Sequence, residues 1–545
     1  MQSIKMRGVC AAVTGALLFG FGANAMADST TDIVNALIAK GVLTEEEGAL
    51  INKGREGEAA GQAKAIKKAG KLSISDAVDN ATVYGDVRVR YEDRSGDGLA
   101  GGKDGSSAAA GSPYIAVNNG TVSANASLNA WTGSAAGPFA SGAVAPGATY
   151  LHVGSASGST NPVAASNVTE RRERARYKIT MGVKTNAGNW YSDLAFAMGN
   201  AGRSDNATFG NFNASTAPNS AGNLNNKETL FVKRAMVGYK ATDWLTLEAG
   251  RMENPLYTTP MVWDADLTFE GLAEKVKYKV GDNLDLFGTA AQMQYLGDKK
   301  SYFLGSGSST TTNELLAFQG GARYAFDDRT SAKVALTYTT MTHGSQDGSK
   351  KFTPGLGINN LVNNYEVNDL DTIEIPAEIN FMAMPNVGVR VFGDYVYNTS
   401  GSDRFNAAVA AAAAGDRAAI TAAGNDDTAW MLGVAVGSAK DLKAFESNKM
   451  VAGDWSARIW YQDVGVYSID QNAVDSDFFD SRVNMKGTTF KAQYNVQDNV
   501  LLNVAYGHAT RKNDALGTPT GSGNDISGIN VNSFDLFQFD VTYKF

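Results

Sequence analysis

The sequence predicts an all-β fold, a transmembrane antiparallel β-barrel of about sixteen strands with a short helical segment before it. Three observations lead to this prediction. Apolar and polar residues alternate in segments along most of the chain, the connections between these segments alternate between short and long, and the N-terminus has the pattern of an export signal. We expect a signal peptide over residues 1–27, a helical and linker segment over 28–80, and the barrel over 81–545, with its largest surface loop at 93–170.

The first 27 residues have the three parts of a cleaved signal peptide. Lys5 and Arg7 precede the apolar run GVCAAVTGALLFGFG, and the tripeptide AMA at 25–27 has the small residues of a cleavage site. The apolar run is shorter than the roughly 20 residues that a membrane-spanning helix needs. The chain's one cysteine, Cys10, lies in this segment, so the mature chain is expected to form neither disulfides nor thiolate metal sites.

The segment that follows, residues 28–75, has helical rather than strand spacing. Thr44 precedes three glutamates as a helix cap does, and Gly41 interrupts the preceding run. The apolar residues that recur at helical spacing are Ile33, Val34, Leu37, Ile38, Leu50 and Ile51. We expect a small helical hairpin on the periplasmic side, serving either as a soluble tether or as a plug or trimer contact.

The strand pattern is clearest at the C-terminus, in FDLFQFDVTYKF. Aromatic and apolar residues occupy every second position of this stretch up to Phe545, with polar or charged residues between them. Because a strand points successive side chains to opposite faces, one face is apolar and the other polar. The same alternation recurs in VYGDVRVRYE, RARYKITMGVK, VGVRVFGDYVYN and TFKAQYNV. We expect the apolar faces to point outward and the charged faces to point into the barrel.

The connections between these segments also favour a membrane barrel. TNAGN, GDN, FDDR and QDN are tight turns, and longer polar stretches lie between them. Within a bilayer every backbone polar group must be paired, which a closed sheet achieves. Apolar-face aromatic residues near strand ends fit the two interfacial girdles of such a barrel: Tyr91, Trp190, Tyr239, Tyr278, Tyr324, Tyr461 and Tyr506.

Composition argues against nucleic-acid binding and catalysis. The formal net charge is −8, and removal of Lys5 and Arg7 with the signal peptide leaves −10, which disfavours a nucleic-acid partner. The histidines, His152, His343 and His508, are far apart in sequence and lie in or beside expected loops. They offer no frame for a Ser-His-Asp site or a histidine metal site. We expect no enzyme activity, no cofactor and no metal; an outer-membrane phospholipase remains a minor alternative.

Several segments spread over the mature chain carry a resemblance: DIVNALIAKGVLTEEEGALIN, YGDVRVRYE, WDADLTFEG, GDWSARIWYQDVG, DSDFFDSRVNMKG and the phenylalanine end. In these the sequence resembles the Putative porin family of Gram-negative bacterial outer membranes, which is similar to general porins. The resemblance implies an outer-membrane channel for passive diffusion of ions and small hydrophilic solutes, without catalytic residues. The Ala, Gly and Ser-rich insert at 95–168 departs from the family and affects the expected surface shape more than the barrel.

The resemblance also implies partners. Porins of this type lie in outer-membrane lipid and commonly form homotrimers, so a homotrimer is expected here. The C-terminal Tyr543 and Phe545 resemble the signal that the barrel assembly machinery reads during biogenesis.

A pore constriction is the expected functional site. In sixteen-stranded porins the third long connection commonly folds into the lumen, and here that connection is residues 253–270. Its acidic residues are Glu253, Asp264, Asp266 and Glu270, and the basic residues expected to line the pore are Arg88, Arg90, Arg174, Arg176, Lys178, Arg234 and Arg251. Opposed charge rows would create a transverse field that orients dipolar solutes.

The charges at the expected inward positions predict the ion selectivity of the channel. Lysine and arginine outnumber aspartate and glutamate at the expected inward positions, which predicts a weak anion preference, opposed by the acidic third loop.

A surface adhesin or structural barrel is one alternative to the channel function. A barrel sheath for an electron-transfer conduit is the other, although the chain has no CxxCH motif and would need a separate cytochrome.

Overall fold

Residues Ser75–Phe545 form one compact unit, and the computed structural model describes its strands and part of their connections. The described residues are 78–100, 114–117, 149–152, 167–199, 204–210, 228–296, 313–342, 370–411, 414–438, 451–514, 516–518, 525–526 and 529–545. The expected signal peptide at 1–27 and helical segment at 28–75 lie outside these residues.

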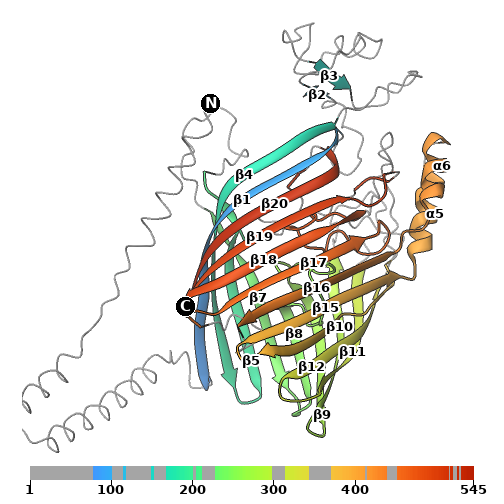
Figure 1. Ribbon diagram of the computed structural model, residues 1–545. Helices are drawn as coiled ribbons and strands as arrows, with labels where there is room; N and C mark the ends of the chain where they lie inside the picture. Colours follow the sequence, from blue (N-terminus) through green and yellow to red (C-terminus); the bar gives the residue numbers. More distant parts are fainter. Residues whose placement is uncertain are drawn as a thin grey trace, which may run out of the picture. The chain divides into compact units, whose positions relative to one another are not determined.

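One antiparallel sheet closes on itself to form the barrel (Figure 1). The sheet contains 18 strands; β13 and β14 share one place in the ring, and the two-residue β6 only adds to β4, so the ring has 16 positions. Strand β1, Asn80–Ala100, pairs with the last strand, β20, Ile529–Lys544, and on its other side with β4, Asn167–Ala187. The predicted closed antiparallel barrel is therefore confirmed.

The remaining elements follow in sequence order around the ring. Their bounds are β5 Trp190–Gly199, β6 Ala207–Thr208, β7 Thr229–Lys240, β8 Leu245–Met252, β9 Phe269–Val280, β10 Leu284–Leu296, β11 Asn313–Ala325, β12 Thr330–Met341, β13 Thr372–Glu374, β14 Ala377–Met384, β15 Val387–Asn398, β16 Thr428–Ser438, β17 Trp455–Val464, β18 Met485–Gln497 and β19 Val500–Arg511. Strands β2, Tyr114–Val117, and β3, Thr149–His152, form a separate two-stranded sheet.

Two helices, α5 Gly401–Ala411 and α6 Ala414–Ala423, lie in the connection between β15 and β16. In the part of the chain that the structure describes, no helix has both the length and the apolar character to cross a membrane.

The two faces of the wall differ as the alternation predicts. In β1 the side chains of Val83, Val87 and Val89 are exposed on the outside, whereas Arg90 and Arg94 are buried inside. The exposed outer residues are mostly valine, leucine, isoleucine and aromatic residues, which is the composition of a lipid-facing surface.

Outward aromatic side chains form a row near each end of the barrel. At the end with the short turns, the rings of Trp190 and Tyr239 lie 4.6 Å apart, and those of Tyr324 and Phe326 lie 5.0 Å apart. Toward the end with the long loops, Trp430 lies 5.4 Å from Tyr461. These rows mark the two borders of the apolar band.

Strands β1 and β4 extend further than the 93–170 loop boundaries expected from the sequence. β1 continues to Ala100 and β4 begins at Asn167, with paired backbones throughout. In the added length, the outward side chains of the two strands are polar and contact each other. For example, Arg171 donates to both carboxylate oxygens of Asp93. Apolar alternation stops there, so it does not reveal the extra strand length.

Candidate pore constriction

The third loop, residues 253–268 between β8 and β9, folds inward against the opposite wall. The hydroxyl of Thr258 donates to Glu374 of β13 at 2.5 Å, and that of Thr259 donates to Asp394 of β15 at 2.5 Å. Both acceptor side chains are buried on the inner face of the wall. The third loop is therefore hydrogen-bonded to the inner face of β13 and β15.

A second inward loop, the seventh loop at residues 465–484 between β17 and β18, meets the third loop inside the barrel. The backbone N–H of Asp264 donates to the carbonyl of Ala473 at 2.6 Å, and the N–H of Ser476 donates to the Asp264 carboxylate at 3.0 Å. Asp475 N–H also reaches the Pro260 carbonyl at 3.3 Å. The third and seventh loops are therefore joined directly to each other by these hydrogen bonds.

The inward position of the seventh loop is not among the features predicted from the sequence. The available signal is the number of large apolar residues in a connection that should otherwise be polar; they are buried in the structure: Val466, Tyr467, Ile469, Val474, Phe478, Phe479 and Val483. These side chains belong to a hydrophobic cluster that also includes Met261 of the third loop and Trp460 of the wall.

The tip of the seventh loop has an unusual backbone. Phe479, Asp480 and Ser481 have consecutive φ angles of 44°, 53° and 56°. Non-glycine residues seldom adopt this left-handed region, and a run of three is costly unless surrounding contacts impose it. Here the Asp480 carboxylate accepts a hydrogen bond from Arg94 of β1 at 3.0 Å and from the backbone N–H groups of Asp525 and Ile526 at 2.7 and 2.9 Å.

Arg90 and Arg94 of the predicted first strand make the main contacts to this tip. Arg90 Nη1 lies 3.0 Å from the Asp477 carboxylate and Arg90 Nε lies 2.7 Å from Asp540 of β20. Burial raises the pKa of Asp477, but the charges of Arg90, Arg94 and Lys491 outweigh it and hold that pKa well below its ordinary value. Asp477 is thus an ionised partner of the basic wall.

Arg174 and Arg176 lie on β4 beside this group. Arg174 Nε donates to Glu92 at 2.7 Å and also contacts Asp525 of the eighth loop, residues 512–528. Arg176 donates to the Ser204 hydroxyl at 2.7 Å. Both predicted residues therefore lie inside the barrel. Their guanidinium groups are already engaged by neighbouring side chains, which reduces the charge that they present to the lumen.

Arg88 and Lys178 face the third loop. Arg88 donates to Asn206 at 2.5 Å, and Lys178 lies 3.3 Å from Asp205. Burial raises the pKa of Asp266 in the third loop, yet the charges of Lys178, Lys233 and Arg88 lower it overall. Asp266 is thus the acidic residue of the third loop that opposes the basic wall.

The other acidic residues of the predicted constriction differ in their surroundings. Glu253 has a largely exposed side chain and lies 2.5 Å from Arg234, whose guanidinium also contacts Asp193 at 2.9 Å. Asp264 is buried and accepts hydrogen bonds from backbone N–H groups, so it braces the two joined loops.

The placement of Arg251 and Glu270 in the pore must be corrected. The inward neighbours Met252 and Phe269 are fully buried, and alternation puts Arg251 and Glu270 on the outer face. There the two side chains form an ion pair across β8 and β9. Glu270 belongs to β9 rather than to the third loop.

A cavity lies on the inner wall formed by β1 and β17 to β20. Four cationic side chains line it, Arg88, Arg90, Arg458 and Lys491, against one carboxylate, Asp540. Lys491 Nζ also lies 4.2 Å from the ring of Phe478 in the seventh loop. This basic cavity therefore borders the two joined loops.

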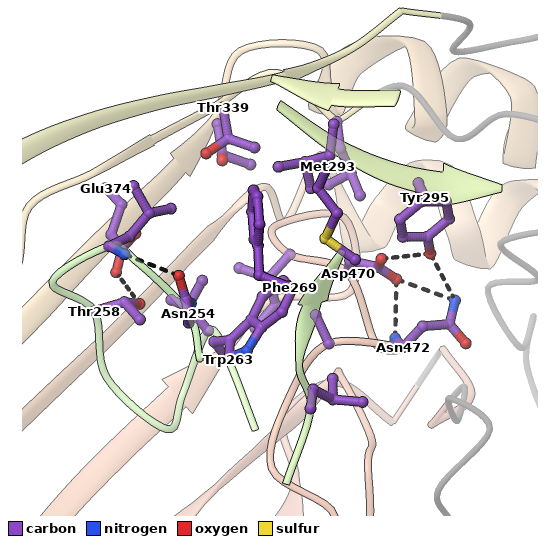
Figure 2. A pocket seen from close by; sticks show the side chains of 18 residues that line it. Asn254, Thr258, Trp263, Phe269, Met293, Tyr295, Thr339, Glu374, Asp470 and Asn472 are labelled. Atoms are coloured by element: carbon purple, nitrogen blue, oxygen red, sulfur yellow. Dashed lines mark hydrogen bonds between the residues drawn. The ribbon is translucent and has the colours of Figure 1, made fainter. Parts of the chain in front are cut away.

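A second, mostly apolar pocket lies between the third loop, the seventh loop and the inner wall (Figure 2). Trp263 and Phe269 lie in its middle, and Glu374 lies at one side. At the other side Tyr295 donates to Asp470 at 2.6 Å. The pocket shows that one side of the lumen is apolar where the other is basic. Among the described residues, no cluster of His, Cys, Asp and Glu is arranged to hold a metal ion.

The C-terminal residue completes the wall. Phe545 and Gly85 of β1 exchange backbone hydrogen bonds, each 3.0 Å long. The side chains of Tyr543 and Phe545 are exposed on the outer face. A Cβ atom on Gly85 would come within 2.4 Å of the Thr180 backbone carbonyl of β4 and within 2.5 Å of the Phe545 ring, so a glycine is needed at this seam. The assembly role of these residues stays a prediction.

Comparison with known proteins gives one family. A profile described as "Putative porin" matches residues 73–351 and 360–545. Among solved structures, the chain is similar to an OmpF of Salmonella typhi in complex with daunomycin, at 12% sequence identity and a TM-score of 0.37, over 87% of this chain and 99% of that chain. None of the curated proteins matches. The family match includes both inward loops.

Proposed function

Because the chain belongs to the Putative porin family, we propose that its barrel is an outer-membrane channel through which ions and small hydrophilic solutes diffuse passively. The observation that carries the proposal is a closed barrel in which the third and seventh loops are joined to each other on the inner side of the wall. A closed wall pairs every strand edge, and inward loops limit the size of a passing solute.

The charges at the narrowing support a transverse field. Asp266 and Glu253 of the third loop face the basic wall that carries Arg88, Lys178 and Arg234. A dipolar solute in this field would be oriented, whereas an apolar solute would not benefit from it.

The proposed selectivity is a weak anion preference. The basic cavity has four cations and one carboxylate in its lining, and charges in a narrow lumen act on a passing ion with little screening. The paired carboxylates around Arg90 and Arg174 reduce the preference without reversing it.

The assembly we propose is a homotrimer in outer-membrane lipid, inserted by the barrel assembly machinery through the Tyr543 and Phe545 end. The family supports the trimer, and the outward aromatic C-terminus supports the assembly signal. The proposed channel has no catalytic role and no cofactor.

Purified protein in planar bilayers tests this function. We expect discrete conductance steps, and a reversal potential under a salt gradient with the sign of an anion-preferring pore. Absence of conductance would contradict the channel. A clear cation preference would contradict the selectivity alone and would point to Asp266 and Glu253 as the controlling charges.

A further inference from the structure

The outer face of β8 to β11 differs from the rest of the barrel wall because it carries charged and amide side chains. Arg251 and Glu270 form an ion pair there, and Gln292 donates to Glu314 at 2.8 Å. We define the polar patch as Arg251, Glu270, Glu274, Gln292, Gln294 and Glu314. Across the rest of the described wall, outward charges such as those of Asp93 and Arg171 lie beyond the aromatic row near the long loops.

The depth of the polar patch follows from the strand register. Tyr239 of β7 is opposite Leu247 of β8, which is opposite Glu274 of β9. Glu274 is in turn opposite Ala290 of β10, which is opposite Phe318 of β11. Strands in a barrel are tilted, so a series of paired residues on neighbouring strands changes depth in the membrane. This series starts in the aromatic row at the short-turn end and rises toward the aromatic row at the long-loop end. Glu274 lies in its middle.

Distance along β9 agrees with this depth. Tyr278, in the aromatic row near the short turns, lies four residues from Glu274 on the same face. At about 3.4 Å per residue and a tilt of about 40°, this separation is about 10 Å along the barrel axis. The Glu274 carboxylate therefore points outward within the apolar band.

Lipid chains cannot satisfy this carboxylate. Glu274 is exposed, and no hydrogen bond or ion pair joins it to another residue in the part of the chain that the structure describes. An ionisable side chain that faces hydrocarbon is costly, and such residues normally have a polar partner. The described residues therefore provide no polar partner for Glu274.

The surface around Glu274 is also flat. Gly288 of β10 lies opposite Gly320 of β11, and both are on the outer face with Ala290 and Ala322. A Cβ atom on Gly320 would meet nothing within 4 Å, so packing within the chain does not require glycine there. Small residues allow a second protein surface to approach closely within a membrane.

We propose that the polar patch is the contact surface for a second copy of this chain in the membrane. The patch contains donors in Arg251 and Gln292 and acceptors in Glu270, Glu274 and Glu314, so around a threefold axis the donors of one copy can meet the acceptors of the next. A second copy brings the donor that Glu274 needs, and a flat wall of the same kind fits against the small residues. This inference rests on the proposed oligomeric channel and names the face that holds it together.

Site-specific cross-linking tests the contact. A photo-crosslinking amino acid in place of Gln292 should give a covalent dimer of this chain in the membrane, identified by mass spectrometry. The matched control is the same amino acid in place of Leu432, an exposed outward residue of β16, which should give none. Equal yields at the two positions, no dimer from Gln292, or a product with a different protein would each overturn the proposal.

A second variant tests the cause of the contact. Replacing Arg251, Glu270 and Glu274 together by leucine should reduce the mass in native mass spectrometry from that of the oligomer to that of one chain, while each barrel keeps its conductance. The control replaces Asp93, Arg171 and Glu173 by leucine and should leave the oligomer intact. A triple variant that stays oligomeric contradicts the proposal. Absence of conductance in the unmodified protein would instead contradict the proposed channel, whatever the cross-linking result.

Discussion

Arg94 in β1 and Asp480 in the seventh loop form a fully buried ion pair, although 386 positions separate them in sequence. The same guanidinium lies 2.9 Å from Glu92, so one arginine joins the wall to the loop. This pair holds the left-handed tip of the seventh loop in place. The narrow part of the lumen therefore depends on a charge that the barrel wall provides.

Replacing Arg94 by glutamine should release the seventh loop. Breaking a buried ion pair by removing one partner costs about 3–5 kcal/mol, because Glu92 and Asp480 lose their shared counter-charge. We expect a lower unfolding temperature and a larger, noisier single-channel conductance. Arg171→Gln is the control: this arginine is exposed, so water screens its pair with Asp93 and the change should have little effect. Unchanged conductance in Arg94→Gln would show that the seventh loop does not limit the pore.

Replacing Thr258 and Thr259 together by valine should loosen the third loop. Each change leaves a buried carboxylate, Glu374 or Asp394, without its hydroxyl donor, at a cost of about 1–3 kcal/mol each. Bilayer recordings should show frequent transitions to a higher conductance level. Thr488→Val, on the exposed outer face of β18, should behave like the unmodified protein. A steady, normal conductance in the double variant would contradict this view of the third loop.

Neutralising the basic cavity should change selectivity. In the Arg458→Gln and Lys491→Gln double variant, half of the cations that line the cavity are lost, so the reversal potential should shift toward cations. The control has the same change in net charge but outside the lumen: Arg329→Gln in a short turn and Arg417→Gln in α6. Equal shifts in the two double variants would show that net charge, rather than lumen charge, sets the preference.

Replacing Phe545 by serine should reduce the amount of folded barrel in the outer membrane several-fold, because both the seam with β1 and the proposed assembly signal lose an aromatic ring. The fraction of protein with the faster gel mobility of unheated folded barrel measures this. Phe326→Ser removes an equally exposed outward aromatic residue from a short turn and should have a smaller effect. Equal effects would contradict a specific role of the C-terminus.

The sequence predicts the wall well because lipid imposes a strict pattern on it. Alternation in the first and last strands places Val89 outward and Arg90 inward, and closure follows because an open edge cannot exist in lipid. The same alternation rule also gives the correct position of Glu270. The buried neighbour Phe269 points inward, and an odd separation along one strand puts Glu270 on the opposite face.

The seventh loop could not be predicted in the same way. Its conformation depends on Asp480 meeting Arg94, a contact that no local pattern encodes, and left-handed φ angles at Phe479 and Ser481 contradict local preference. The inward third loop was expected from the family resemblance, but the particular partners of Thr258 and Thr259 depend on how the whole ring closes.

The hydrogen-bond network around Arg94 contains residues of both the first and the last strand of the barrel. Glu92 and Arg94 come from β1, and Gln538 of β20 donates to Glu92 at 2.9 Å. These residues become neighbours only when the first and last strands meet, so the seventh loop has no complete docking place before that moment. We therefore expect an order in biogenesis, in which the seam between β1 and β20 forms before the seventh loop is fully docked. A barrel halted before closure would leak.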